Sequence, residues 1–137
     1  MLSNAIHPNV QLVFELDQGL AQLFGYEVVQ AGEGQCVLKV VVREQFVNAA
    51  GLAHGSLAFT LMDTASAYSI ASLDSMGVTI NANTTYVKGV SAGDELITRA
   101  SIFTRSKRIL SMRSEVLVKE AVVAHGSFVF QLLEPRN

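Results

Sequence analysis

Residues 55–73 read Gly55-Ser-Leu-Ala-Phe-Thr-Leu-Met-Asp63-Thr-Ala-Ser-Ala-Tyr-Ser-Ile-Ala-Ser-Leu73, and this segment governs the architecture of the chain. Large apolar side chains fall on nearly every side of a helical wheel drawn through it, so the wheel has no polar stripe. A helix of this kind is normally buried. The rest of the chain is therefore expected to surround it.

Asp63 is the only Asp, Glu, Lys or Arg between Glu44 and Asp74. A lone carboxylate in an apolar helix is costly to desolvate, so such groups tend to be paired, to have a raised pKa, or to take part in chemistry. The helix sequence alone is equally compatible with a structural and a catalytic role for Asp63. The preceding segment, from Asn48 to Gly55, is where a partner for chemistry is expected.

Composition predicts one ordered domain over residues 1–137. The chain is 50% apolar and 16% charged, which excludes a disordered protein. Its mean hydropathy of +0.34 is high for this size and predicts that some apolar surface meets another subunit. The net charge of −2 provides no basic field for nucleic acid.

The compartment is predicted to be the cytoplasm. A single cysteine, Cys36, cannot form an intramolecular disulfide, and the N-terminus lacks the basic start of a signal peptide. Residues 56–73 approach the length of a membrane span, but Asp63 and several Ser and Thr residues interrupt them. No membrane association is expected.

The remaining segments predict one further helix and six strands. Residues 78–86 alternate apolar and polar side chains, which is typical of a strand with one buried face. The connections between consecutive strands are short and favour antiparallel pairing. The expected segments are a helix at 9–24, a hairpin of 26–31 and 35–42, and strands at 78–86, 94–104, 108–118 and 121–133. An antiparallel sheet curled around the central helix would cover it on all sides, which is an α+β fold of the hot-dog type.

A motif runs through these segments as Asn48-x5-His54-Gly55-x7-Asp63, followed by a Gly77-Val-Thr79 strand that ends Tyr86-Val-Lys88-Gly89. With this motif the chain resembles the PaaI-type hot-dog acyl-CoA thioesterases, over roughly residues 8–133. The resemblance implies hydrolysis of an acyl-CoA thioester without a metal, with coenzyme A as part of the substrate and no separate cofactor.

Gly55 begins the central helix, where free backbone N–H groups and the positive end of the helix dipole can stabilise a developing oxyanion. A plain helix-start glycine is the alternative, and the resemblance assigns the oxyanion role. His54 can contact the carbonyl or hold the loop. Relatives usually have a second glycine where this chain has Ser56, whose hydroxyl can cap the helix or narrow the acyl channel.

Asp63 lies roughly 13 Å along the helix axis from His54, too far to act on a carbonyl held at Gly55 of the same helix. The resemblance implies a dimer in which Asp63 of one subunit faces Gly55 of the other and acts as general base or nucleophile. Asn48 would orient the water, or else form an Asx turn. Thr79 would bond Asp63, or else be an ordinary strand residue.

Arg105, Lys107 and Arg108 cluster at a predicted hairpin turn, where they are expected either to contact coenzyme A phosphates or to be plain solvated surface. Two other functions remain open: a hot-dog module that binds acyl-CoA or acyl carrier protein without turnover, and a dehydratase or hydratase of the same fold. Aryl, arylacetyl and medium-length acyl groups all suit an apolar channel. A dimer, and a dimer of such dimers, is the expected assembly.

Overall fold

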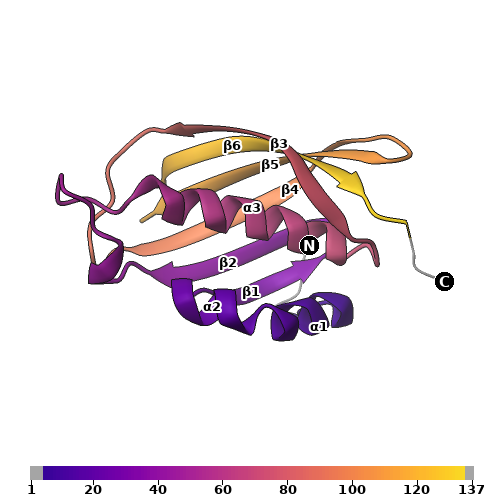
Figure 1. Cartoon of the computed structure of the whole chain (residues 1–137), viewed down its shortest axis with the longest axis horizontal. Helices are drawn as coiled ribbons and strands as arrows, with labels where there is room; N and C mark the ends of the chain where they lie inside the picture. Colours follow the sequence, from indigo (N-terminus) through magenta and orange to yellow (C-terminus); the bar gives the residue numbers. More distant parts are fainter. Residues whose placement is uncertain (1–4, 135–137) are drawn as a thin grey trace.

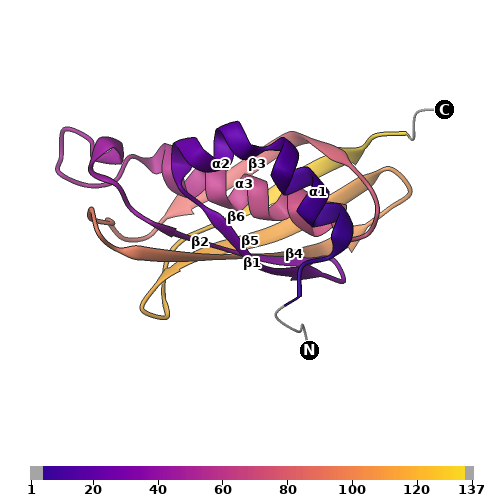
Figure 2. The same cartoon turned by 90° about the horizontal axis from the view of Figure 1, so that it is seen from below.

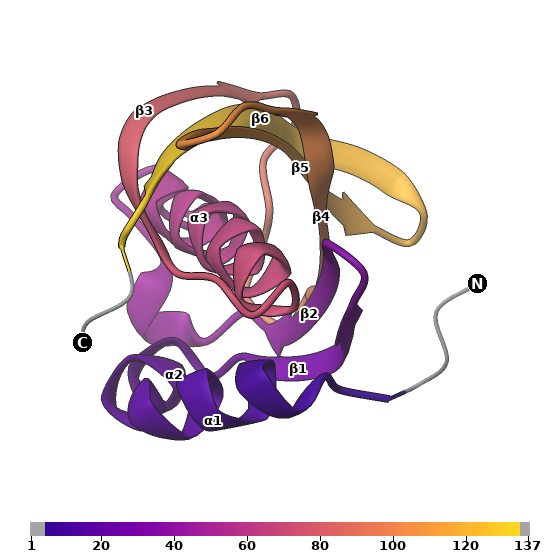
Figure 3. The same ribbon diagram turned by 90° about the vertical axis from the view of Figure 1, so that its right-hand side faces the viewer.

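A curved six-stranded sheet wraps around one long helix in the computed structural model, which describes residues 5–134 (Figures 1 and 3). The helix, α3, spans Gly55–Ala71. The strands lie in the order β1 (Glu27–Gly32), β2 (Gln35–Val41), β4 (Glu95–Arg105), β5 (Ile109–Val118), β6 (Ala121–Leu132) and β3 (Gly77–Tyr86), all antiparallel. The predicted α+β hot-dog architecture is confirmed.

The core lies between α3 and the inner face of the sheet. Buried and more exposed positions alternate along β2, β4 and β5 because successive strand side chains point to opposite faces. The side chains that fill this space are mostly large and apolar. They include Leu38, Leu57, Leu61, Met62, Leu96, Leu110, Met112, Phe128 and Phe130. The three α-helices lie on the same side of the sheet (Figure 2).

The helix predicted at 9–24 is divided at Asp17 into α1 (Pro8–Leu16) and α2 (Gln18–Phe24). His7 caps α1, because its Nδ1 accepts from the Asn9 N–H at 3.1 Å. Gly25 ends α2 in the left-handed conformation, with φ of +84°. Only part of the apolar pattern faces the core: Val10 is buried, whereas Leu16 is 76% exposed.

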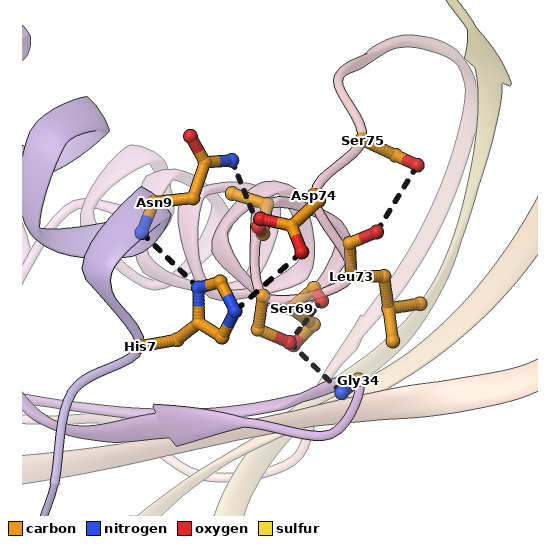
Figure 4. A network of polar contacts seen from close by, with 9 residues as sticks. His7, Asn9, Gly34, Ser69, Leu73, Asp74 and Ser75 are labelled. Carbon is orange, nitrogen blue, oxygen red and sulfur yellow. Dashed lines mark hydrogen bonds and ion pairs between the residues drawn. The ribbon is translucent and has the colours of Figure 1, made fainter.

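Polar contacts attach α1 to the C-terminal end of α3 (Figure 4). The Asn9 side-chain amide donates to the Ala71 carbonyl at 2.9 Å, and His7 Nε2 lies 3.8 Å from Asp74 Oδ2. Deeper in the core, Tyr68 donates to Asp17 Oδ2 at 2.8 Å. These bonds hold α1 and α2 over part of the side of α3 that the sheet does not cover, the part away from β3.

The strand β3 differs from its prediction in two ways. It pairs with β6 at the edge of the sheet, and it does not pair with β4, although only a short connection separates the two. The expected buried face is also wrong, because Val78 is 46% and Ile80 is 52% exposed. Thr79 pairs with the buried Phe130 and bonds Asp63, so it points toward α3. The adjacent Val78 therefore points to the outer face of the sheet.

The sheet does not enclose α3 completely, contrary to expectation. Ser56 and Phe59 are exposed and Asp63 is half-buried, and these positions recur on one side of the helix. The open side lies next to β3 (Figure 3). Among the described residues 5–134, no helix is long and apolar enough to cross a lipid bilayer.

Candidate active site

A pocket of about 360 Å³ lies at the N-terminal end of α3. Asn48, His54 and Gly55 line one wall, and the segment from Tyr86 to Val90 lines another. Apolar side chains from the inner face of the sheet form the floor, among them Leu96, Val116 and Val123. The structure therefore brings together three of the predicted site residues beside an apolar cavity.

Gly55 is closely packed against Tyr86. The Tyr86 hydroxyl donates to the Gly55 carbonyl at 3.1 Å, and a Cβ placed on Gly55 would lie 3.1 Å from Tyr86 Cζ. The Gly55 N–H belongs to the first turn of α3, where the helix itself offers no acceptor. A glycine at this position thus provides an amide donor without an acceptor in the helix, and its lack of a side chain accommodates Tyr86.

His54 is the N-cap of α3, and its Nδ1 accepts a 3.0 Å hydrogen bond from the Ser56 N–H. Ser56 Oγ lies 2.9 Å from the same nitrogen and donates to it. Because Nδ1 acts as an acceptor, the proton of the neutral ring is assigned to Nε2. The predicted capping of the helix is therefore carried out by His54, and Ser56 orients the imidazole.

Asn48 shapes the loop that precedes α3. Its Oδ1 accepts from the Ala50 N–H at 3.0 Å and from the Leu52 N–H at 3.2 Å, which is the Asx turn left open by the sequence. Its side-chain nitrogen has no partner within the part of the chain that the structure describes. Because Asn48 also lines the pocket, that NH2 group can donate to a bound molecule.

Asp63 and Thr79 form a second group of polar side chains, separate from the pocket. Thr79 Oγ1 donates to Asp63 Oδ1 at 2.6 Å, as one of the two predictions for Thr79 required. Burial raises the pKa of Asp63 above its ordinary value, and the Thr79 hydrogen bond opposes part of that rise. The result is a partly desolvated carboxylate held in one orientation, which suits a general base or a nucleophile.

The two groups are separated along α3. Asp63 follows Gly55 by eight positions of helix, about 12 Å, and neither Asp63 nor Thr79 lines the pocket. Within one protomer the structure brings together Asn48, His54 and Gly55 at one place, and Asp63 with Thr79 at another. One small substrate cannot contact both groups of the same chain.

The predicted basic cluster lies at the turn between β4 and β5. Arg105, Lys107 and Arg108 are all exposed there, and Arg108 forms a 3.4 Å ion pair with Glu134. The pocket is lined by the opposite ends of these strands, at Leu96 and Val116. Ten residues of extended β4 therefore separate the cluster from the pocket of its own protomer, roughly 30 Å.

Two parts of the pocket were not predicted as site residues. Tyr86 contacts Gly55, and Lys88 to Val90 form a wall. The only available signal was the Tyr86-Val-Lys88-Gly89 end of the strand, which contributed to the resemblance without a role for each residue. Among residues 5–134, no three His, Cys, Asp or Glu side chains gather closely enough to hold a metal ion.

Comparison with known proteins agrees with this geometry. The thioesterase superfamily matches residues 50–125, which include most of the candidate site. A putative esterase of Archaeoglobus fulgidus is 30% identical over 81 residues, which cover 59% of this chain and 53% of that protein. Human acyl-coenzyme A thioesterase 13 is 27% identical over 84 residues, or 60% of each protein. The chain thus spans little more than half the length of the curated relatives it matches.

Solved structures show the same fold. The PaaI protein of Escherichia coli, from its phenylacetic acid degradation operon, superposes with a TM-score of 0.83 at 24% identity. The superposition covers 90% of this chain and 94% of the PaaI chain. The superposition therefore covers a larger part of the chain than residues 50–125.

Proposed function

The chain belongs to the thioesterase superfamily, and on this premise we propose that it hydrolyses the thioester bond of an acyl-coenzyme A. One observation carries the proposal: α3 presents a free N-terminal amide at Gly55 beside an apolar pocket, and a Thr79-bonded carboxylate at Asp63 on its open side. An amide donor and a desolvated carboxylate are the two groups that acyl transfer to water needs. The relationship to acyl-coenzyme A thioesterase 13 supports coenzyme A as the carrier.

The two groups meet in a dimer. The edge of β3 is unpaired, and the side of α3 that carries Asp63 is open beside it. A second copy that adds its own β3 to this edge pairs the free backbone N–H and C=O groups of the strand and lays the two central helices side by side. In an antiparallel arrangement of these helices, Asp63 of one copy comes opposite Gly55 of the other. Each site then takes Asn48, His54 and Gly55 from one subunit and Asp63 with Thr79 from its neighbour.

The reaction follows from these positions. The thioester carbonyl oxygen accepts hydrogen bonds from the Gly55 N–H and His54 Nε2, while the Asn48 amide and Asp63 hold a water molecule. Asp63 takes a proton from this water as its oxygen attacks the carbonyl carbon, and negative charge forms on the carbonyl oxygen. The carbon–sulfur bond then breaks, and the proton passes from Asp63 to the departing thiolate. The raised pKa of Asp63 makes it a stronger base than an exposed carboxylate.

The acyl group is proposed to be aryl, arylacetyl or of medium chain length. The apolar floor of the pocket suits such groups, and its volume of about 360 Å³ is at the small end of ligand pockets. Lys107 and its neighbours are proposed to contact the phosphates of coenzyme A. The basic turn lies at the same end of the protomer as Asp63. Phe130 of β6 pairs on one side with Thr79, which bonds Asp63, and on the other side with Leu110, which follows the turn.

Release of free coenzyme A thiol from a panel of acyl-CoA esters tests the proposal. We expect steady turnover with at least one aryl or medium-chain ester, and the same rate of turnover after a metal chelator is added. Tight binding of the same esters without thiol release would identify a non-catalytic acyl-CoA module. Loss of an enoyl or hydroxyacyl signal without thiol release would identify a dehydratase or hydratase.

A further inference from the structure

Tyr86 joins the end of the edge strand to the first turn of the central helix. It is the last residue of β3, and the backbone N–H groups of Val87 and Lys88 both donate to the Val123 carbonyl, at 2.8 and 3.2 Å. Opposite Tyr86 on β6 is the small Ala124, which also lines the pocket. The end of the strand is therefore fixed, and it holds the ring of Tyr86 against α3.

The contact with Tyr86 gives a reason for the glycine at position 55. Gly55 does not have a positive φ, so its backbone conformation does not itself require a glycine. A Cβ there would lie 3.1 Å from Cζ and 3.3 Å from the hydroxyl oxygen of Tyr86. With no side chain between them, the Tyr86 hydroxyl reaches the Gly55 carbonyl and donates to it at 3.1 Å. That oxygen has two lone pairs, so it can also accept the helical N–H four residues further on.

The Gly55 carbonyl shares its peptide group with the Ser56 N–H. This N–H donates to Nδ1 of His54 at 3.0 Å. A hydrogen bond accepted by the carbonyl polarises the peptide and strengthens the bond that the N–H of the same peptide donates. The Tyr86 hydroxyl, this peptide and the His54 imidazole are therefore connected in line.

The peptide N–H selects the tautomer of His54. A backbone N–H can only donate, so Nδ1 must be the acceptor and the proton of the neutral ring stays on Nε2. The Ser56 hydroxyl, 2.9 Å from Nδ1, can rotate and is able to accept as well as donate, so it does not select a tautomer by itself. The nitrogen left with the proton, Nε2, is the one that donates to the thioester carbonyl in the proposed reaction.

On the premise of the proposed thioester hydrolysis, we propose that Tyr86 is a positioning residue. It acts through the peptide between Gly55 and Ser56 and holds His54 in the tautomer and orientation in which Nε2–H stabilises the oxyanion. Tyr86 lines the pocket and is 51% exposed in the protomer. A bound acyl group removes water from the Tyr86 hydroxyl, and the hydrogen bond gains strength as the local dielectric falls. The effect of Tyr86 therefore belongs mainly to kcat.

Steady-state hydrolysis of an active acyl-CoA ester by Tyr86→Phe tests the proposal, with Tyr26→Phe as the matched control. Each variant loses one phenolic hydroxyl, but that of Tyr26 lies 2.9 Å from the Tyr68 hydroxyl, and Tyr26 does not line the pocket. We expect Tyr86→Phe to lower kcat roughly three- to tenfold, the equivalent of one net hydrogen bond, and to leave KM unchanged because the ring remains. Tyr26→Phe should lower Tm and leave kcat unchanged. A wild-type kcat for Tyr86→Phe, a change in KM alone, or equal losses of kcat in the two variants would overturn the proposal.

A double-mutant cycle shows whether Tyr86 acts through His54. His54→Ala removes the imidazole and keeps the contact between Tyr86 and Gly55. If the chain of hydrogen bonds ends at the imidazole, Tyr86→Phe lowers kcat in the wild-type background and has little further effect in His54→Ala. Equal losses in both backgrounds would mean that Tyr86 acts independently of His54, which contradicts the proposal.

NMR of the protein without substrate tests the hydrogen bonds independently of turnover. The chain has three histidines, so the ring nitrogen signals of His54 are identified by their absence from His54→Ala. With neutral rings, the wild type should show Nδ1 as an unprotonated nitrogen and Nε2 as a protonated one. Tyr86→Phe should bring the two signals closer together and speed solvent exchange of the Ser56 amide, whereas Tyr26→Phe should change neither.

These signals also separate the proposal from the function on which it rests. A protein that hydrolyses no ester but shows the changes in His54 and Ser56 would overturn the proposed function and retain the chain of hydrogen bonds. A protein that hydrolyses esters, with the same His54 signals and Ser56 exchange in Tyr86→Phe as in the wild type, would overturn the role of Tyr86 alone.

Discussion

Thr79 on the edge strand donates a 2.6 Å hydrogen bond to Asp63 in the middle of the central helix. The bond orients the only charged side chain of α3 and joins that helix to β3, the least buried strand of the sheet. It also opposes the rise in pKa that burial imposes on the carboxyl group. The orientation of Asp63 therefore depends on the Thr79 hydroxyl, and its pKa reflects burial, which raises it, opposed by this hydrogen bond.

Replacing Asp63 with Asn is expected to reduce kcat at least about a hundredfold, because Asn keeps the volume and loses the proton acceptor. Steady-state hydrolysis of an active acyl-CoA ester measures the effect, with sedimentation as a control for assembly. Turnover close to wild type would exclude Asp63 from the chemistry. A single turnover of the wild type in heavy-oxygen water then separates direct attack, which labels Asp63, from attack by water.

Replacing Thr79 with Val should move the acidic limb of the kcat profile to higher pH. The Thr79 hydrogen bond lowers the pKa of Asp63, so its loss lets burial raise that pKa further, and the base becomes protonated at a higher pH. Thr79→Ser keeps the hydroxyl and is expected to leave the limb in place. An identical profile for Thr79→Val would show that Asp63 does not limit the reaction at low pH.

Gly55→Ala should lower kcat by roughly a hundred- to a thousandfold, the range found when one oxyanion donor is lost. The new Cβ would lie 3.1 Å from Tyr86 Cζ, so the methyl group displaces Tyr86 and obstructs the approach of the thioester to the amide. Gly19→Ala is the matched control, because its methyl group meets nothing within 4 Å. If both variants remain fully active, Gly55 has no special role.

The double variant Lys107→Ala, Arg108→Ala should raise KM with little change in kcat, because contacts far from the thioester act equally in the ground and transition states. The effect should shrink at high salt, since these side chains are exposed. Esters of 3′-dephospho-coenzyme A provide the control and should show a smaller difference. An unchanged KM for the complete ester would make the turn ordinary solvated surface.

Mixing two inactive variants tests the shared site. If Asn48→Ala and Asp63→Ala are unfolded and refolded together, a heterodimer contains one site with both defects and one wild-type site. We expect activity to return to this mixture and to neither variant alone. Native mass spectrometry confirms that the heterodimer forms. A heterodimer without activity would place each complete site within a single chain.

The local sequence pattern was sufficient to predict most of the helices and strands. The Gly-Glu-Gly turn predicted the β1–β2 hairpin, and the alternating runs after residue 94 predicted β4, β5 and β6, because strand period and turn residues act over a few positions. The residues of the pocket wall at 48–55 were also identified, since they lie close together in sequence. Tyr86 was missed because its contact with Gly55 spans 31 positions.

By itself the sequence determined the element types, the buried helix and the isolation of Asp63 within it, all of which follow from hydrophobic period and composition. Only the tertiary structure decided that β3 pairs with β6, that one side of α3 stays open, and that the leucines of α1 and α2 face solvent. The order of the strands and the exposure of a helix face depend on which surfaces are left uncovered after the core has packed. A helical or strand period shows that a face is apolar, but not whether its own chain or another copy covers it.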